Sequence, residues 1–262
     1  FDGIRQQLAA GLSISTSGFS FWGSDMAGLV GKPDDELMIR SIQFSTFQPL
    51  MRAGGDMTKQ PWDYSDSTVN VFIKHFWLRK NLLKSIYSYA IYSHISGSPM
   101  TKAMAVSYPE FTRATGLGTQ YMFCDSILFV PVLEAGTKSI EVAFPKGLWY
   151  SLFDESIIAG ETIKRIPVAL DYSPAFLKSG TVLPVTTDKN MNLFSPFDAD
   201  SSLEVLLITP PEGIHTYKHY NTEGESFILI NELKADGVCQ VKSDTKRYKG
   251  ICFFEKAKSV KS

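Results

Sequence analysis

The sequence predicts two kinds of structure in succession, an α/β region up to residue 108 and an all-β region beyond it. Before residue 108, apolar residues recur mainly at helical spacing, most regularly over residues 66–96. After residue 108, the chain shows strand-length apolar runs separated by Gly, Pro or Asp. The expected order of the first part is helix, strand, helix, helix, strand, which is typical of α/β folds.

The first predicted strand is the one that matters most for function. Residues 1–10 have the spacing of a helix, which Gly11 could end. Residues 12–21 then interleave Ile14, Phe19 and Phe21 with serine and threonine, a pattern that fits a strand. Trp22 and Asp25 directly follow it, on a glycine-flanked loop that could form the floor of a pocket.

Two helices and a further strand complete the α/β region. Asp34 is expected to cap a largely buried helix, with Asp35 and Glu36 in its first turn. A long helix over residues 66–96 should end at Gly97, and residues 100–106 are apolar enough for another strand.

The all-β region reads as two modules. A polar break near Pro196 separates one set of strands from a second, smaller set. The first set is expected to form a sandwich. The expected strands cover residues 120–132, 140–144, 149–153, 163–168 and 181–185, then 203–208, 215–220, 227–230, 237–242 and 250–254.

Composition narrows the function classes. The 262 residues are 44% hydrophobic, and 26 basic and 27 acidic side chains give a net charge of −1. This balance lacks the excess of positive charge expected of a protein that binds nucleic acid or an anionic membrane. No apolar run is long enough to span a bilayer. The three cysteines form no CxxC pair, the four histidines lack metal-ligand spacing, and no glycine loop for phosphate is present. We therefore expect no metal and no cofactor.

Four stretches, residues 18–29, 36–52, 120–132 and 144–150, resemble motifs of glycoside hydrolase family 31, and they occur in the family order. The family contains α-glucosidases and α-xylosidases. The resemblance implies the C-terminal portion of a (β/α)8 TIM barrel followed by two β-sandwich domains. The expected boundaries are 1–108 for the barrel part, 109–195 for the proximal sandwich and 196–262 for the distal one.

The resemblance also implies a mechanism. The family hydrolyses α-linked glycosides with retention, using a carboxylate nucleophile and a carboxylic general acid/base. The stretches that carry these two groups in the family do not occur here. We therefore expect both to lie upstream of Phe1, no catalytic residue within these residues, and no activity from this piece alone. Its expected partners are a carbohydrate substrate and the N-terminal part of the same enzyme.

Asp25 is the leading candidate for a substrate-binding residue. At the end of a barrel strand it would hydrogen-bond sugar hydroxyls or orient neighbouring charged groups; alternatively it is a loop aspartate that caps local N–H groups. Trp22 would stack on a sugar ring or, equally, be an ordinary core residue. Leu29 stands where relatives usually have a phenylalanine that lines the sugar site.

The loop after residue 51 supplies the other candidates. Arg52 would support the site as a bidentate donor, or else be an ordinary surface arginine. Gly54 stands where most relatives have a histidine that contacts a sugar hydroxyl, and Asp56 could replace that contact. These departures put plain glucose specificity in doubt and leave room for a larger sugar.

Three other readings stay open. A degenerate relative would bind carbohydrate or regulate a partner subunit, and a glucan lyase would use the same scaffold for elimination. A β-sandwich interaction module that retains remnants of a barrel is the third.

Overall fold

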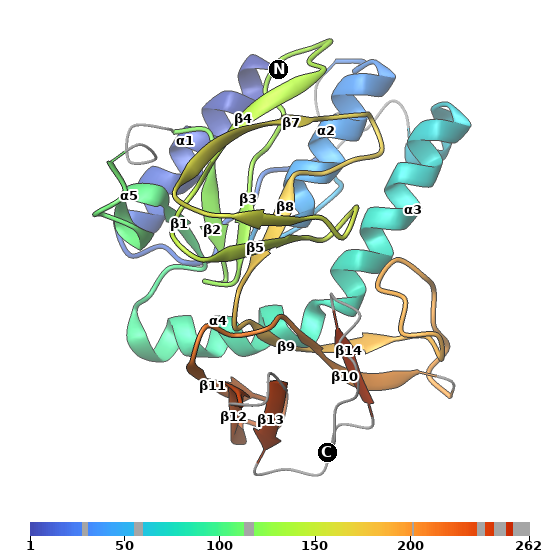
Figure 1. Ribbon diagram of the computed structural model, residues 1–262. Helices are drawn as coiled ribbons and strands as arrows, with labels where there is room; N and C mark the ends of the chain where they lie inside the picture. Colours follow the sequence, from blue (N-terminus) through green and yellow to red (C-terminus); the bar gives the residue numbers. More distant parts are fainter. Residues whose placement is uncertain are drawn as a thin grey trace.

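The computed structural model describes residues 1–27, 31–54, 60–112, 118–200, 202–234, 239–243 and 250–253. Helices come first along the chain and strands follow (Figure 1). The helices are α1 Asp2–Thr16, α2 Asp35–Thr46, the 3-10 helix Pro61–Asp63, α3 Asp66–Asn81, α4 Leu83–Ser96 and α5 Met104–Ser107.

The strands form four sheets. They are β1 Thr101–Ala103, β2 Tyr121–Phe123, β3 Ile127–Phe129, β4 Ser139–Phe144, β5 Leu148–Ser151, β6 Ile157–Ala159, β7 Thr162–Pro167, β8 Ala175–Lys178, β9 Val182–Thr187, β10 Leu203–Ile208, β11 Ile214–Tyr220, β12 Ser226–Leu233, β13 Cys239–Ser243 and β14 Gly250–Phe253. The strand orders are β1-β2-β3-β8-β5-β6, β4-β7, β14-β10-β9 and β11-β12-β13. Within the described ranges, no sheet closes into a barrel.

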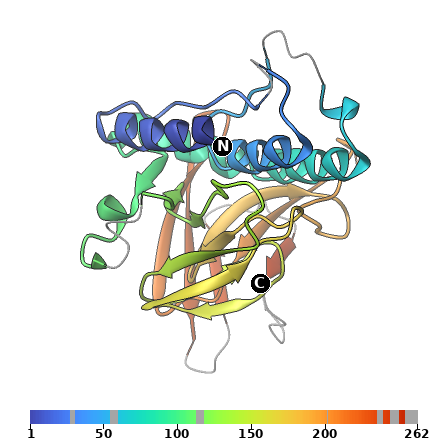
Figure 2. The same cartoon turned by 90° about the horizontal axis from the view of Figure 1, so that it is seen from above.

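The helices lie along one side of the green and yellow strands (Figure 2). Helix α4 runs between those strands and the orange and red strands near the C-terminus, and it packs against β9 and β11 (Figure 1). One hydrophobic core continues from α1, α2 and α4 into β2, β3, β8 and β10. The helical and the β regions therefore share the largest of the hydrophobic clusters that the described residues form.

The strand predicted over residues 12–21 is wrong, because α1 continues to Thr16. Leu12 and Ser15 extend the buried face begun by Ile4 and Leu8. The polar side chains that suggested a strand bond the preceding turn instead: Ser15 Oγ donates to the Gly11 carbonyl at 2.8 Å. Residues 19–24 belong to no helix or strand, and Asp25, directly after them, forms a β-bridge.

The single helix predicted over residues 66–96 is two helices that meet at Leu82. Leu82 is 1% exposed, so its side chain is part of the core at the point where the direction changes. The predicted helix ends are correct: Ser65 caps α3, and Gly97 ends α4 with a φ of 73°. A left-handed residue at this position favours glycine.

The predicted strand over residues 100–106 is present only as β1, and it is not a barrel strand. β1 pairs antiparallel with β2 at the edge of the six-stranded sheet, and α5 follows it. β9 likewise pairs with β10 across residue 195. The two boundaries between the three predicted domains stay a prediction, but each pairing crosses one of them.

The predicted strand over residues 120–132 is a hairpin. Cys124 and Asp125, at the turn between β2 and β3, have φ values of 49° and 55°. Two consecutive left-handed residues define a type I′ turn, which matches the twist of a hairpin. Cys124 thus takes a backbone conformation that favours glycine.

Helix α2 shows why its motif has charged and polar residues on a buried face. Asp34 caps it, as predicted, by accepting from the Leu37 N–H at 2.8 Å. Arg40, 2% exposed, donates to the carbonyls of Val168 and Ala169 at 3.1 Å. Gln43 donates to the Leu170 carbonyl at 2.7 Å. These bonds dock the helix on the connection between β7 and β8.

Candidate functional site

Two extended segments, residues 22–26 and 50–52, lie side by side and carry the best candidate site. The Leu50 N–H donates to the Trp22 carbonyl and the Met26 N–H to the Arg52 carbonyl, each at 3.0 Å. Asp25 and Arg52 form a parallel β-bridge. A Cβ on Gly23 would lie 2.4 Å from the Leu50 carbonyl oxygen, so a glycine is needed for this close approach.

Asp25 and Arg52 form a bidentate ion pair. Nε of Arg52 lies 2.5 Å from one carboxylate oxygen of Asp25, and the second bond, from a terminal nitrogen, is 2.8 Å. The arginine side chain is 72% exposed and the aspartate 16%. The hydrogen bond from Arg52 lowers the pKa of Asp25 below its usual value, so the carboxylate is ionised at neutral pH.

Asp25 lines a cavity of about 320 Å³ beside the start of α1 and α2. The polar residues around it are Gln7, Lys32 and Ser41, and its apolar walls include Ile4 and Leu37. Ser41 Oγ also accepts from the Ala27 N–H at 2.7 Å, which fixes the chain just after Asp25. A cavity that combines apolar walls with a few fixed polar groups suits a small polar ligand.

A buried clamp holds the two segments in register. Gln48 is fully buried; its side-chain oxygen accepts from the Ser24 N–H at 2.7 Å, and its amide nitrogen lies 2.9 Å from Ser24 Oγ. Arg79 donates to the carbonyls of Thr46, Gln48 and Pro49 at 2.5 to 3.0 Å. Gln48 and Arg79 thereby set the position of the backbone that leads to Arg52.

Trp22 points into the packing between α1 and β1. Its indole N–H donates to Ser15 Oγ at 2.7 Å and to Thr101 Oγ1 at 2.9 Å. Its ring lies so close to Gly11 that a Cβ there would be 2.2 Å away. This geometry favours the core alternative for Trp22 over stacking on a sugar.

Gly54 borders open space. Among the described residues, the atom nearest to a Cβ built on it would be Arg52 Nε, at 3.9 Å. A larger side chain would therefore fit beside the Asp25–Arg52 pair. Leu29 and Asp56 lie outside the described residues.

The structure thus brings together Asp25, Arg52 and Gly54 and separates Trp22 from them. Sequence reasoning missed Gln48, Ser24 and the cavity residues Gln7, Lys32 and Ser41. Gln48 lies within a motif stretch, between Phe47 and Pro49, but nothing in the pattern indicates that a polar side chain there is fully buried. Nothing in the sequence indicates that Gln7 lines a cavity, because it occupies a helix position that the apolar pattern places on the exposed face.

A large apolar groove lies on the other side of Arg52. It measures about 760 Å³ and is lined by Phe21, Leu50, Phe76, Leu83 and Tyr87, which are 42 to 53% exposed. No helix in the described part of the chain is long and apolar enough to cross a membrane. Within the same ranges, no group of three or more His, Cys, Asp or Glu could hold a metal ion.

Two family models match in succession. The "Glycosyl hydrolases family 31 TIM-barrel domain" covers residues 1–89, and the "Glycosyl hydrolase family 31 C-terminal domain" covers residues 97–183. The chain belongs to glycosyl hydrolase family 31. The resemblance read from the four sequence motifs is thereby confirmed, and the first model carries both the Asp25 and the Arg52 segments.

Family 31 relatives with different activities match this chain. An isomaltosyltransferase of Sporosarcina globispora is 35% identical over 71% of this chain. An alpha-xylosidase of Saccharolobus solfataricus is 33% identical over 72%, and neutral alpha-glucosidase C of Mus musculus 29% identical over 84%. The chain spans 18%, 27% and 25% of these three proteins.

Among solved structures, a cycloalternan-forming enzyme from Listeria monocytogenes, in complex with a pentasaccharide substrate, matches with a TM-score of 0.83 and 29% identity. The match covers 89% of this chain and 24% of that enzyme. A family 31 alpha-xylosidase from Xanthomonas citri matches with a TM-score of 0.79 over 98% of this chain, at 18% identity, which supports the fold alone.

Proposed function

We propose that this chain is the C-terminal part of a retaining α-glycosidase and that the Asp25–Arg52 pair forms one wall of its sugar-binding site. The observation that carries this proposal is the bidentate pair, which joins two adjacent segments and whose aspartate, Asp25, lines a cavity of about 320 Å³. The nucleophile and the general acid/base would come from the part of the protein that precedes residue 1.

The chemistry of the pair suits a sugar. An ionised carboxylate accepts strong hydrogen bonds from hydroxyl groups. The guanidinium of Arg52, bound through two hydrogen bonds, holds that carboxylate in one orientation. Because Arg52 keeps Asp25 ionised, Asp25 serves as an acceptor rather than as a proton donor. We assign it to substrate binding and not to proton transfer.

The remaining predicted site residues would complete the wall. Gly54 would leave more room than a histidine, and Leu29 more than a phenylalanine, while Asp56 could supply a hydrogen bond to the sugar. Trp22 would act through packing, because its ring is held against α1.

The apolar groove next to Arg52 supports an incomplete barrel in these residues. Two barrel segments cannot close a barrel, so their apolar side chains need further strands as partners. Phe21 and Leu50, on the two candidate segments, are both at least half exposed. Strands from the preceding part of the enzyme would cover them.

A second candidate function is transfer of a sugar to another sugar instead of to water. The observation that favours it is the open space at Gly54, together with 35% identity to an isomaltosyltransferase. A saccharide acceptor needs room that a water molecule does not. A degenerate binding protein and a lyase stay as further alternatives.

The test compares residues 1–262 alone with the same residues joined to the rest of their protein. Both are assayed on aryl α-glucosides and α-xylosides, with NMR of the anomeric products. We expect no turnover from residues 1–262 alone and turnover with retention from the whole protein. Robust turnover by residues 1–262 alone would contradict the assignment of the carboxylates to the preceding part.

The product distinguishes the remaining candidates. Longer oligosaccharides indicate transfer, and unsaturated sugars indicate a lyase. A whole protein that lacks either carboxylate and binds sugars without turnover would be the degenerate relative.

A further inference from the structure

A second polar cavity lies on the face of α4 that points away from the apolar groove. Leu83, Ile86, Tyr87 and Ala90 of α4 line the groove. Ser85, Ser88, Tyr89 and Tyr92 line a separate cavity of about 420 Å³, closed by the β2–β3 turn and by strand β11. A third cavity, of about 400 Å³, adjoins it beside β1 and α5.

Asp125 and Lys178 line both of these cavities. Asp125, at the type I′ turn, accepts from the Tyr89 hydroxyl and from Lys102 Nζ, the latter at 2.7 Å. The carboxylate is thus fixed and partly neutralised by its own neighbours. It keeps free acceptor positions, because a carboxylate has about four lone-pair sites.

Lys178 is the second charged group that the two cavities share. Its side chain is partly buried, and in the described part of the chain its ammonium has no hydrogen bond or ion pair. Asp125 attracts it without coming within ion-pair distance, and burial lowers its pKa. Among the described residues, its Nζ is not one of the buried side-chain atoms that lack a partner, so water from the cavity solvates it. A polar ligand would take the place of that water.

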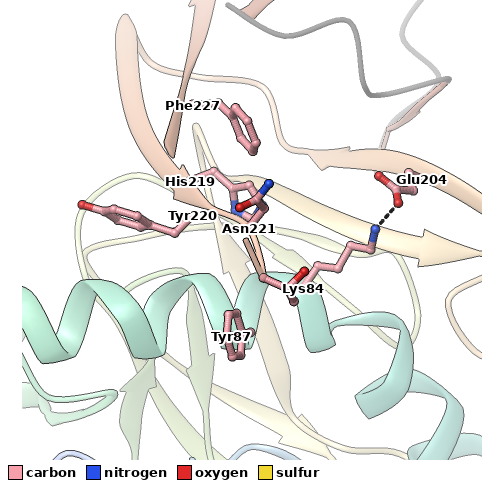
Figure 3. Close-up of a pocket in the computed structure, with 8 residues that line it drawn as sticks. Lys84, Tyr87, Glu204, His219, Tyr220, Asn221 and Phe227 are labelled. Atoms are coloured by element: carbon pink, nitrogen blue, oxygen red, sulfur yellow. Dashed lines mark hydrogen bonds and ion pairs between the residues drawn. The ribbon is translucent and has the colours of Figure 1, made fainter. Parts of the chain in front are cut away.

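A neighbouring cavity provides a useful contrast (Figure 3). This smaller space, about 40 Å³, also lies between α4 and β11 and shares His219 with the larger one. Its lysine, Lys84, is paired with Glu204 (Figure 3). The smaller cavity therefore has a satisfied cation and little room, whereas the larger one has an unpaired cation and ample room.

We propose that the cavity between α4, the β2–β3 turn and β11 binds a neutral saccharide through Asp125 and Lys178. Adjacent hydroxyls of a sugar can accept from the ammonium and donate to the carboxylate at the same time. The rings of Tyr89 and Tyr92, whose centroids are 5.3 Å apart, offer aromatic faces for the C–H groups of the sugar.

Charge distinguishes this ligand from an anion. Lys178 and Lys218 both line the cavity, together with Asp125. A phosphate or carboxylate would use the two lysines alone and would meet the carboxylate of Asp125 across the same space. A neutral polyol uses both kinds of group. The proposal does not depend on the reaction carried out elsewhere in the protein.

The test measures binding of maltotriose and isomaltotriose to the full chain by isothermal titration calorimetry, in an Asp25→Asn background that weakens the first site. We expect Lys178→Met and Asp125→Asn each to weaken binding by at least about tenfold. The matched control is Lys164→Met, an exposed lysine on β7. It should leave the affinity unchanged.

Thermal unfolding separates a ligand role from a structural one. Lys178→Met removes an unpaired charge and should leave the melting temperature equal or higher, while still losing affinity. Unchanged saccharide affinity in both variants would overturn the proposal. So would binding of inorganic phosphate that depends on Lys178 when neither trisaccharide binds.

Discussion

The guanidinium of Arg52 donates two hydrogen bonds, of 2.5 and 2.8 Å, to the carboxylate of Asp25. The two residues come from adjacent extended segments, 27 positions apart, whose register is fixed by Gln48 and by backbone bonds. The pair is therefore part of a built arrangement rather than a contact between two free surface side chains. We propose that a sugar would recognise both the fixed orientation and the charge of the Asp25 carboxylate.

Arg52→Lys keeps the charge but replaces the planar fork with a single ammonium. We expect Asp25 to lose its fixed orientation, so that KM for an aryl α-glycoside rises roughly tenfold while kcat changes less. Steady-state kinetics of the whole protein measure this. Arg165→Lys, at an exposed ion pair on β7, is the control. Equal kinetics for both variants would argue against the orienting role.

Gly54→His restores a polar side chain beside Arg52. The position has room, since no atom of the described residues lies closer than 3.9 Å to a Cβ there. We expect a lower KM for monosaccharide glycosides and a smaller share of transfer products. Gly54→Ala adds the Cβ without the imidazole. If the histidine and alanine variants behave alike, a hydrogen bond at this position does not matter.

Part of this site could be predicted because it depends on local rules. Asp34 is followed by two acidic residues and an apolar helix pattern, and it caps α2 as predicted. Asp25 and Arg52 were found because the resemblance placed them in two motifs of one family. Their mutual bond follows from the parallel bridge between the segments, which only the folded chain shows.

The failures have physical causes. Residues 12–16 alternate like a strand but continue α1, because their hydroxyls bond the preceding helical turn. The periodicity of residues 66–96 is unbroken, so the change of direction at Leu82 left no trace in the pattern. The roles of Gln48 and Lys178 depend on residues far away in the sequence. A pattern of neighbouring residues does not show which distant residues will lie beside them in the fold.

Arg79→Met removes three hydrogen bonds to buried carbonyls near the Arg52 segment. Burial lowers the pKa of Arg79 to about 10, yet the guanidinium stays charged at neutral pH and satisfies all three acceptors. We expect a loss of about 3 kcal/mol in the free energy of unfolding. Urea unfolding measures it. Arg165→Met, whose ion pair is exposed, should cost less than about 1 kcal/mol.

His75 predicts acid sensitivity of the fold. Burial lowers its pKa to about 4, and its ring is bonded to the Val71 carbonyl and to Ser173 Oγ. Between pH 6.5 and 4 the unfolded chain binds a proton that the folded chain does not. Stability therefore falls as pH falls through that window, by about 3 kcal/mol in total.

The measurement for His75 is urea unfolding at pH 7 and at pH 4.5, compared with His75→Gln. The glutamine can still hydrogen-bond but does not titrate. We expect the variant to show a smaller loss between the two pH values. An identical loss in both proteins would mean that His75 does not titrate in this window.

The most direct test of the proposed sugar site is kcat/KM of Asp25→Asn in the whole protein, measured on an aryl α-glycoside beside Asp154→Asn as an exposed control. We predict a loss of roughly 10- to 100-fold for Asp25→Asn, because a charged acceptor for hydroxyls is gone. The melting temperature should barely change, since the ion pair is largely exposed on the arginine side. A kcat/KM equal to that of the control would contradict the assignment of Asp25 to the sugar-binding wall.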